Sequence, residues 1–447
     1  MYYLTMMDSW LYDETKPFIH IEAGDTFDEL KKNARNGYFE KLIKEYLLDN
    51  NHKSIISLVP EYGLEKEKEQ KEADKLAEYK STLTNDELEQ LVKKTKELKE
   101  YQDTPSSQED LEKIPMLELS DIKREPAKDY NDVKSVDGIK IVHHNIFTNK
   151  IAYINMSFDT KCVPDELIPY MGLLGSTLSL MDTKNYTYPE LTNEININCG
   201  GLATGTALYS DKVDFSKNTI VYEVKSKALY EKVPFVLGMM EEIMYNTRFD
   251  DYKRLKEIIA RIKSRLEASL MGQGHSIAML ECCAQFSESA YYSDILRGYK
   301  YYEFIKKLDE EFEQNKTQIV DKLNKLVGYI FNKDNVIVSL TADDEGYDCF
   351  VKALSAKSCN IKDEHYNTAV RSFIPVNVKT GYTSASQVQY VARCGNFVKD
   401  GYKYTGALKV LKVIFSYDYL WINVRVKGGA YGCMSGSSRN GDFYMVS

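Results

Sequence analysis

The stretch GIKIVHHNIFTNKIAYINMSFD, residues 138–159, decides the fold class of the central part of this chain. Apolar and polar residues alternate on both sides of a polar break, which is the pattern of two strands that each bury one face. We expect these two strands to pair with each other as a hairpin. The residues that follow, 166–184, have helical spacing instead. Strands and helices mixed in this way predict a domain of the α+β class.

The same mixed pattern continues along the chain. Segment 197–227 has the composition of strands, and two long helical segments follow it at 232–246 and 251–270. The second helix carries one apolar face, formed by Leu255, Ile258, Ile259, Ile262 and Leu266. Another strand is expected at 335–342. Residues 126–358 are therefore predicted to form a complete α+β domain.

Residues 61–125 differ from this domain because they are dense in Glu and Lys and sparse in apolar residues. Thr84 is followed three residues later by Glu87, which is a capping box and predicts the start of a second helix there. Ser106 and Glu109 repeat the pattern before the next proline. We expect a charged helical hairpin that links two larger units.

The two ends of the chain read as incomplete domains. In residues 1–60, strand-like PFIHIEA (17–23) and SIISLVPE (54–61) flank a helical segment, which is too little for a free-standing domain. In residues 359–447, a strand at 384–395, a helix at 404–427 and two short strands joined at Asn440-Gly441 repeat the order of the central domain. The long covering helices do not follow. We therefore expect truncation at both ends.

The C-terminal helix is expected to be buried on its apolar side. The residues that predict this are Leu411, Ile414, Phe415, Trp421 and Val424.

Composition excludes several classes of function. The chain has 447 residues, 43% of them hydrophobic, and a formal net charge of -9, which argues against a nucleic-acid partner. It contains no apolar run long enough to span a bilayer, so we expect no membrane partner. Its eight cysteines form no CxxC pair and are typical of reduced thiols, which favours a cytoplasmic location.

A metal or nucleophile motif is not apparent in the sequence. No two histidines stand four residues apart, so neither HExxH nor HxxEH occurs. His143 and His144 are adjacent on an expected strand and would point to opposite faces. His365, beside Asp363 and Glu364, is a weak metal candidate in an expected linker. The glycine-rich segment 200–205 is expected to start a strand rather than bind phosphate. We expect no metal bound to this chain.

The corner LWINVRVKGGAYGCMSG, residues 420–436, carries the candidate catalytic and substrate-binding residues. Arg425 lies near the end of the helix, Gly428 and Gly429 let the chain turn, and Tyr431 is expected to open the next strand. Arg425 and Tyr431 could each donate a hydrogen bond to a peptide carbonyl as it becomes an oxyanion. The alternative is an ordinary helix cap followed by an aromatic core residue.

Several segments together resemble the presequence protease group of the insulinase/pitrilysin zinc metallopeptidases. They are YLWINVRVKGGAYGCMSG with SRNGDFYMVS, YQDTPSSQEDLEKIPMLELSDIKRE, LLGSTLSLMDTKNYTYPELTNEININCGG and NTRFDDYKRLKEIIARIKSRLEASLMGQGHS. The resemblance covers nearly the whole chain, in the family's order. It implies α/β roll domains like those of mitochondrial processing peptidase, joined by a helical hairpin. Residues 1–60 would then be the tail of a second domain, 126–358 the third and 359–447 the fourth.

The resemblance also implies a function. In such enzymes two halves close around an unfolded peptide, one half carries zinc and the general base on HxxEH, and the fourth domain supplies an Arg and a Tyr. By motif, these are Arg425 and Tyr431 here, with Gly428 and Gly429 in the substrate-binding corner. The zinc-bearing N-terminal half would lie elsewhere, in the same or a separate chain. This chain alone would be inactive.

Two other interpretations remain open. The chain could be a non-catalytic subunit or scaffold of the same fold that pairs with a separate zinc-bearing chain. It could also be purely structural, with Arg425 and Tyr431 only packing.

Overall fold

The computed structural model describes residues 2–126, 128–357, 360–384 and 388–447. The chain divides into two compact units, Met1–Lys123 and Arg124–Ser447, and each is described by itself. The first division expected from composition, near residue 125, lies beside this junction. The second, at 358–359, falls outside the described residues. The division of residues 126–447 into a third and a fourth domain therefore remains a proposal.

The first unit consists of short helices without a core. Its elements are α1 (Tyr2–Trp10), α2 (Gly24–Ala34), α3 (Tyr38–Leu42), η1 (Ile43–Leu48), α4 (Leu64–Thr82), α5 (Asn85–Asp103), α6 (Gln108–Glu112) and η2 (Leu119–Asp121). No residue described between 2 and 123 is buried. The two strands predicted at 17–23 and 54–61 are wrong, because neither segment forms a ladder. A strand needs a neighbouring strand to satisfy its backbone groups, and the described part of this unit offers none.

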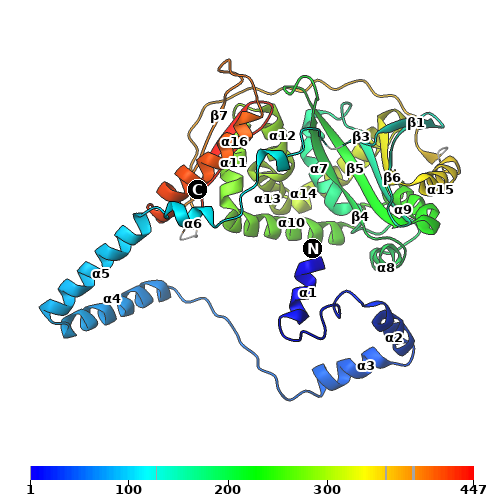
Figure 1. The fold of residues 1–447 in the computed structure, drawn as a ribbon. Helices are drawn as coiled ribbons and strands as arrows, with labels where there is room; N and C mark the ends of the chain where they lie inside the picture. The colour runs from blue at the N-terminus through cyan, green and yellow to red at the C-terminus, as the bar shows by residue number, and fades with distance from the viewer. Residues whose placement is uncertain (1, 127, 358–359, 385–387) are drawn as a thin grey trace. The chain divides into compact units, whose positions relative to one another are not determined.

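The charged hairpin is confirmed at its turn. Helices α4 and α5, the long blue and cyan helices of Figure 1, are separated by Leu83 and Thr84 alone. The Glu87 backbone N–H donates to Thr84 Oγ1 (3.3 Å), and the Thr84 N–H donates to the Glu87 carboxylate (2.8 Å), so the predicted capping box is present. The second predicted box, at Ser106, is wrong by one residue. There Ser107 caps α6 and accepts from the Asp110 N–H at 3.2 Å.

The second unit contains a six-stranded sheet with the order β1-β2-β6-β3-β5-β4. Its strands are β1 (Asp132–Val136), β2 (Ile139–Asn145), β3 (Ile151–Asp159), β4 (Leu202–Ser210), β5 (Asn218–Leu229) and β6 (Val336–Ala342). All pairings are antiparallel except that of β2 with β6, which is parallel. The α+β class and the strands expected in 138–159, 197–227 and 335–342 are confirmed.

The hairpin expected between β2 and β3 is wrong. Strand β6, far downstream in the chain, lies between them and pairs with both, so that Val338 is opposite Ile141 on one side and Met156 on the other. All three of these residues face the core and are almost fully buried. Inserting β6 gives β2 and β3 an apolar central neighbour, whereas a direct hairpin would have left β6 without a place in the sheet.

Helices cover one face of this sheet (Figure 1). They are α7 (Ile168–Thr177), α8 (Tyr188–Asn198), α9 (Val233–Tyr245), α10 (Tyr252–Gly272), α11 (Gly274–Ala284), α12 (Glu288–Arg297), α13 (Tyr299–Glu310), α14 (Phe312–Ile330) and α15 (Asp344–Ser355), with short 3-10 turns η3 (Asp165–Leu167), η4 (Tyr230–Lys232) and η5 (Lys333–Asn335). The predicted apolar face of α10 is confirmed, since Leu255, Ile258, Ile259 and Ile262 are buried in the core. The opposite face of the sheet carries mostly polar side chains.

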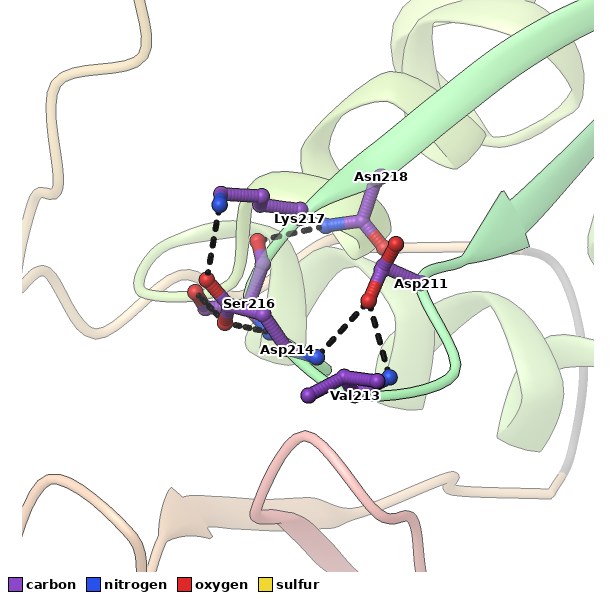
Figure 2. A network of polar contacts seen from close by, with 6 residues as sticks. All are labelled: Asp211, Val213, Asp214, Ser216, Lys217 and Asn218. Carbon is purple, nitrogen blue, oxygen red and sulfur yellow. Dashed lines mark hydrogen bonds and ion pairs between the residues drawn. The ribbon is translucent and has the colours of Figure 1, made fainter.

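The connection between β4 and β5 is fixed by its own side chains (Figure 2). Asp211 Oδ1 accepts from the backbone N–H groups of Val213 and Asp214, each at 2.8 Å. Asp214 in turn accepts from Ser216 and forms an ion pair with Lys217 at 3.3 Å. These turns close the loop and help hold β5 in register with β4.

The C-terminal segment forms a smaller sheet with the order β7-β9-β8. Its elements are β7 (Ala392–Asn396), α16 (Ala407–Ile414), the π-helix η7 (Phe415–Val426), β8 (Met434–Ser437) and β9 (Asp442–Val446). The predicted hairpin around Asn440-Gly441 is confirmed, with Gly441 at φ +96°. Residues 385–387 of the strand expected at 384–395 lie outside the described residues. In the described part of it, β7 begins only at Ala392.

The C-terminal helix is less buried than its sequence predicts. Of the described residues in α16 and η7, only Leu420 is buried, and Leu411 and Ile414 are about half exposed. The expectation of a buried helix is therefore wrong for this chain. The reason is that β8 is the only strand against which the helix makes extensive contact, and one short strand cannot cover its apolar residues.

Asp294 in α12 is expected to make stability depend on pH. It is fully buried, and this burial, with repulsion from Glu281, raises the pKa of its carboxyl to about 6. The unfolded value is about 3.9, so the folded chain binds more protons between pH 4 and 6. The free energy of unfolding should therefore fall as pH rises from about 4 to about 6 and stay lower above that range.

The variant Asp294→Asn is expected to remove this fall. Urea unfolding followed by circular dichroism should show it more stable than wild type at pH 7.5 by about 2 kcal/mol, and close to wild type near pH 4. A variant that keeps the wild-type pH dependence would show that another group causes it.

Candidate functional site

Two glycines end the π-helix η7 and set the shape of the predicted corner. Gly429 has φ +74°, a left-handed conformation, and its N–H donates to the Arg425 carbonyl at 3.0 Å. A Cβ on Gly428 would lie 2.6 Å from the Val424 carbonyl oxygen. A side chain would be strained at the first position and would clash with backbone at the second. The chain can therefore turn back here only with both glycines.

Arg425 is held beside two aromatic rings. Its guanidinium carbon lies 4.4 Å from the centre of the Trp421 ring and 5.8 Å from that of Tyr431. Its Nη1 donates a hydrogen bond to the Tyr431 carbonyl oxygen. The structure thus brings Arg425 and Tyr431 together, as the sequence predicts, and adds Trp421 to the site. Its spacing of four residues from Arg425 on the same helix was the signal for that contact.

Tyr431 differs from its prediction in one respect. It lies in the loop before β8, which begins at Met434, and does not open the strand. Its side chain is 91% exposed. The alternative of an aromatic core residue is therefore wrong for this chain, and the phenol O–H is accessible to a partner.

The corner presents hydrogen-bond donors to solvent. A guanidinium has five N–H donors, and the hydrogen bond from Arg425 to the Tyr431 carbonyl uses only one of its nitrogens. The exposed phenol of Tyr431 adds one O–H donor beside it. Donors arranged in this way can bind a carbonyl oxygen and stabilise negative charge that develops on it.

Metal ligands do not gather in the part of the chain that the structure describes. No three His, Cys, Asp or Glu side chains come together there in a way that could hold an ion. His143 and His144 point to opposite faces of β2, as expected. His143 is buried against the Ala342 carbonyl (3.0 Å), and His144 lies 3.0 Å from Ser339 Oγ. His365 pairs with Asp334 at the surface. The described residues therefore do not fit a zinc site.

Comparison with known proteins places the chain. The model of the peptidase-associated family, which describes the region associated with the peptidases of family M16, subfamily C, matches residues 58–308, more than half of the chain. The chain belongs to this peptidase-associated family. A second model, "PreP C-terminal domain", matches residues 381–447 and includes the corner of Arg425 and Tyr431. The chain therefore resembles the C-terminal portion of an M16 peptidase.

Individual relatives agree with this assignment. Protein HypA of Clostridium perfringens is 39% identical over 452 residues, covering 100% of this chain and 46% of HypA. Presequence protease 1, chloroplastic/mitochondrial, of Arabidopsis thaliana is 28% identical over 437 residues, covering 96% of this chain and 40% of that protein. The chain thus spans less than half the length of these curated relatives.

A solved structure supports the fold. A conserved protein from Enterococcus faecalis V583 superimposes with a TM-score of 0.51 at 14% sequence identity, covering 71% of this chain and 75% of that one. Among the described residues, no helix is both long and apolar enough to cross a bilayer.

Proposed function

We propose that this peptidase-associated chain is the substrate-binding and oxyanion-stabilising half of a zinc-dependent metalloendopeptidase that degrades unfolded oligopeptides. The observation that carries the proposal is the pairing of Arg425 with an exposed Tyr431 at the glycine corner. The match of this segment to the PreP C-terminal domain model supports it.

Within this proposal, each residue of the corner has a role. Gly428 and Gly429 turn the chain so that the helix end and the following loop face each other. Trp421 holds the Arg425 guanidinium in place. Arg425 binds the carbonyl oxygen of the scissile peptide, and the Tyr431 hydroxyl donates to it as negative charge develops in the tetrahedral intermediate. Both donors are more valuable once the site closes and water is excluded.

The zinc and the general base are proposed to come from a zinc-bearing N-terminal half, in the same or a separate chain. That half supplies a metal-bound water for attack on the peptide. The described residues of this chain do not fit a zinc site, so this chain alone is expected to be inactive. We further propose a cytoplasmic location, which rests on the eight cysteines and the absence of CxxC pairs.

Reconstitution tests the proposal. The purified chain is mixed with a zinc-bearing half of an M16 peptidase, and cleavage of a quenched fluorescent unfolded peptide is followed. We expect hydrolysis by the mixture, its loss with 1,10-phenanthroline, and none by this chain alone. Elemental mass spectrometry should find no tightly held zinc on this chain. One zinc per chain, or hydrolysis without the other half, would contradict the proposal.

A further inference from the structure

A groove of about 470 Å³ crosses the polar face of the six-stranded sheet. The strand register explains its lining, because residues directly opposite each other share a face. One row across four strands consists of Ala203, Lys225, Asn155 and Ser339. The next row consists of Lys227, Tyr153 and Thr341. Gly200 and Gly201 close the groove at the β4 end.

Lys227 is directed by a glycine. A Cβ on Gly200 would lie 2.7 Å from Lys227 Cγ and 2.8 Å from its Cε, so the aliphatic part of the lysine side chain lies along the space that Gly200 leaves free. The Gly200 N–H donates to the Lys227 carbonyl at 2.7 Å and fixes the two backbones together. This arrangement holds the lysine side chain along the β4 end of the groove.

The other charges beside the groove compensate one another. Lys225 forms an ion pair with buried Glu223 at 2.5 Å. Burial alone would raise the pKa of Glu223, but its hydrogen bonds to Lys225, Asn155 and Tyr209 lower it below the usual value. Glu223 is therefore ionised and neutralises Lys225. Neither a hydrogen bond nor an ion pair is found for the Lys227 ammonium among the described residues, so the groove carries one uncompensated positive charge.

The groove also has an apolar wall and neutral donors. The Tyr153 ring is 44% exposed beside Lys227. The Ser339 and Thr341 hydroxyls line the side nearest β6. None of the described residues that line the groove is acidic. A site with one ammonium, one aromatic surface and hydroxyls suits a ligand that combines a single negative charge with an apolar group.

We infer that this groove binds the C-terminal residue of a peptide, with its carboxylate on Lys227 and its side chain against Tyr153. The inference rests on the proposed function, because a peptide is the ligand that such an enzyme encounters. A terminal carboxylate is present on every peptide whatever its sequence, whereas an acidic side chain is not. Binding it here would hold substrates at a point separate from the corner of Arg425 and Tyr431.

Direct binding to the full 447-residue chain tests the inference. Fluorescence anisotropy is measured with an N-terminally labelled hexapeptide that ends in leucine, either as the free acid or as the C-terminal amide. We expect the acid to bind about tenfold more tightly, as one charge-assisted hydrogen bond allows. Lys227→Gln should remove this preference. Lys140→Gln, on the same face in β2 but outside the groove, should leave it unchanged.

A second variant and a competitor sharpen the test. Gly200→Ala keeps the lysine but displaces its side chain, so it should reduce the preference for the acid while circular dichroism stays as in wild type. Equal binding of acid and amide would overturn the inference. So would displacement of the acid peptide by inorganic phosphate at the concentrations at which unlabelled acid peptide acts, which would mark a general anion site.

The outcome is separable from that of the proposed function. The binding measurement needs neither the zinc-bearing half nor hydrolysis. If the preference for the acid is absent but the reconstituted enzyme cleaves peptides, only the groove is wrong. If the preference is present but no mixture hydrolyses peptides, the proposed function is wrong and the groove stands.

Discussion

Replacing Tyr431 with phenylalanine is expected to lower the turnover of the reconstituted enzyme about 100-fold, the usual effect of removing one oxyanion donor. The substitution keeps the ring, which lies 5.8 Å from the Arg425 guanidinium, and removes only the hydroxyl. Because that hydroxyl is proposed to act in the transition state, kcat should fall while KM changes little. Steady-state cleavage of a quenched fluorescent peptide measures both constants.

Tyr417→Phe is the matched control. Tyr417 is on the same π-helix and its side chain is 66% exposed, so the substitution removes a similar hydroxyl away from the corner. Its turnover should equal that of wild type. If Tyr431→Phe also kept wild-type turnover, Tyr431 would have only a structural role and the proposed oxyanion site would have to be abandoned.

Replacing Phe331 with alanine is expected to lower the free energy of unfolding by about 3–5 kcal/mol, the range for large aromatic residues in a core. Phe331 follows α14 directly and is fully buried. Its ring lies edge-on to Phe158 (5.1 Å between centres), Tyr222 (5.5 Å) and Tyr245 (6.1 Å). The substitution leaves a cavity between the sheet and the helices and removes three aromatic contacts. Urea unfolding followed by circular dichroism measures the loss.

Phe147→Ala provides the comparison for this substitution. Phe147 lies in the connection between β2 and β3 and is 81% exposed, so its removal should change stability by less than about 0.5 kcal/mol. A loss for Phe331→Ala as small as that for Phe147→Ala would contradict the packing of this ring in the core.

Local patterns in the sequence were sufficient for the helices and for some turns. The apolar spacing of 251–270 predicts α10 because a helix buries every third or fourth residue whatever its partner is. The Thr84–Glu87 cap and the Asn440-Gly441 turn are equally local, since the groups that form them are within a few residues of one another. The candidate pair Arg425 and Tyr431 came from the resemblance, and their proximity follows from a short separation in sequence and two glycines.

Tertiary structure decided what depends on partners distant in sequence. Alternation identified β2 and β3 as strands, but it could not show that β6 lies between them, because a strand's periodicity names its buried face and not its neighbour. The same limit explains the failed strands at 17–23 and 54–61 and the exposed C-terminal helix, which lack covering partners among the described residues. The groove of Lys227 depends on register across four strands. The sequence by itself thus determined the elements and the family, and only the folded chain decided which elements meet, because pairing and burial are non-local.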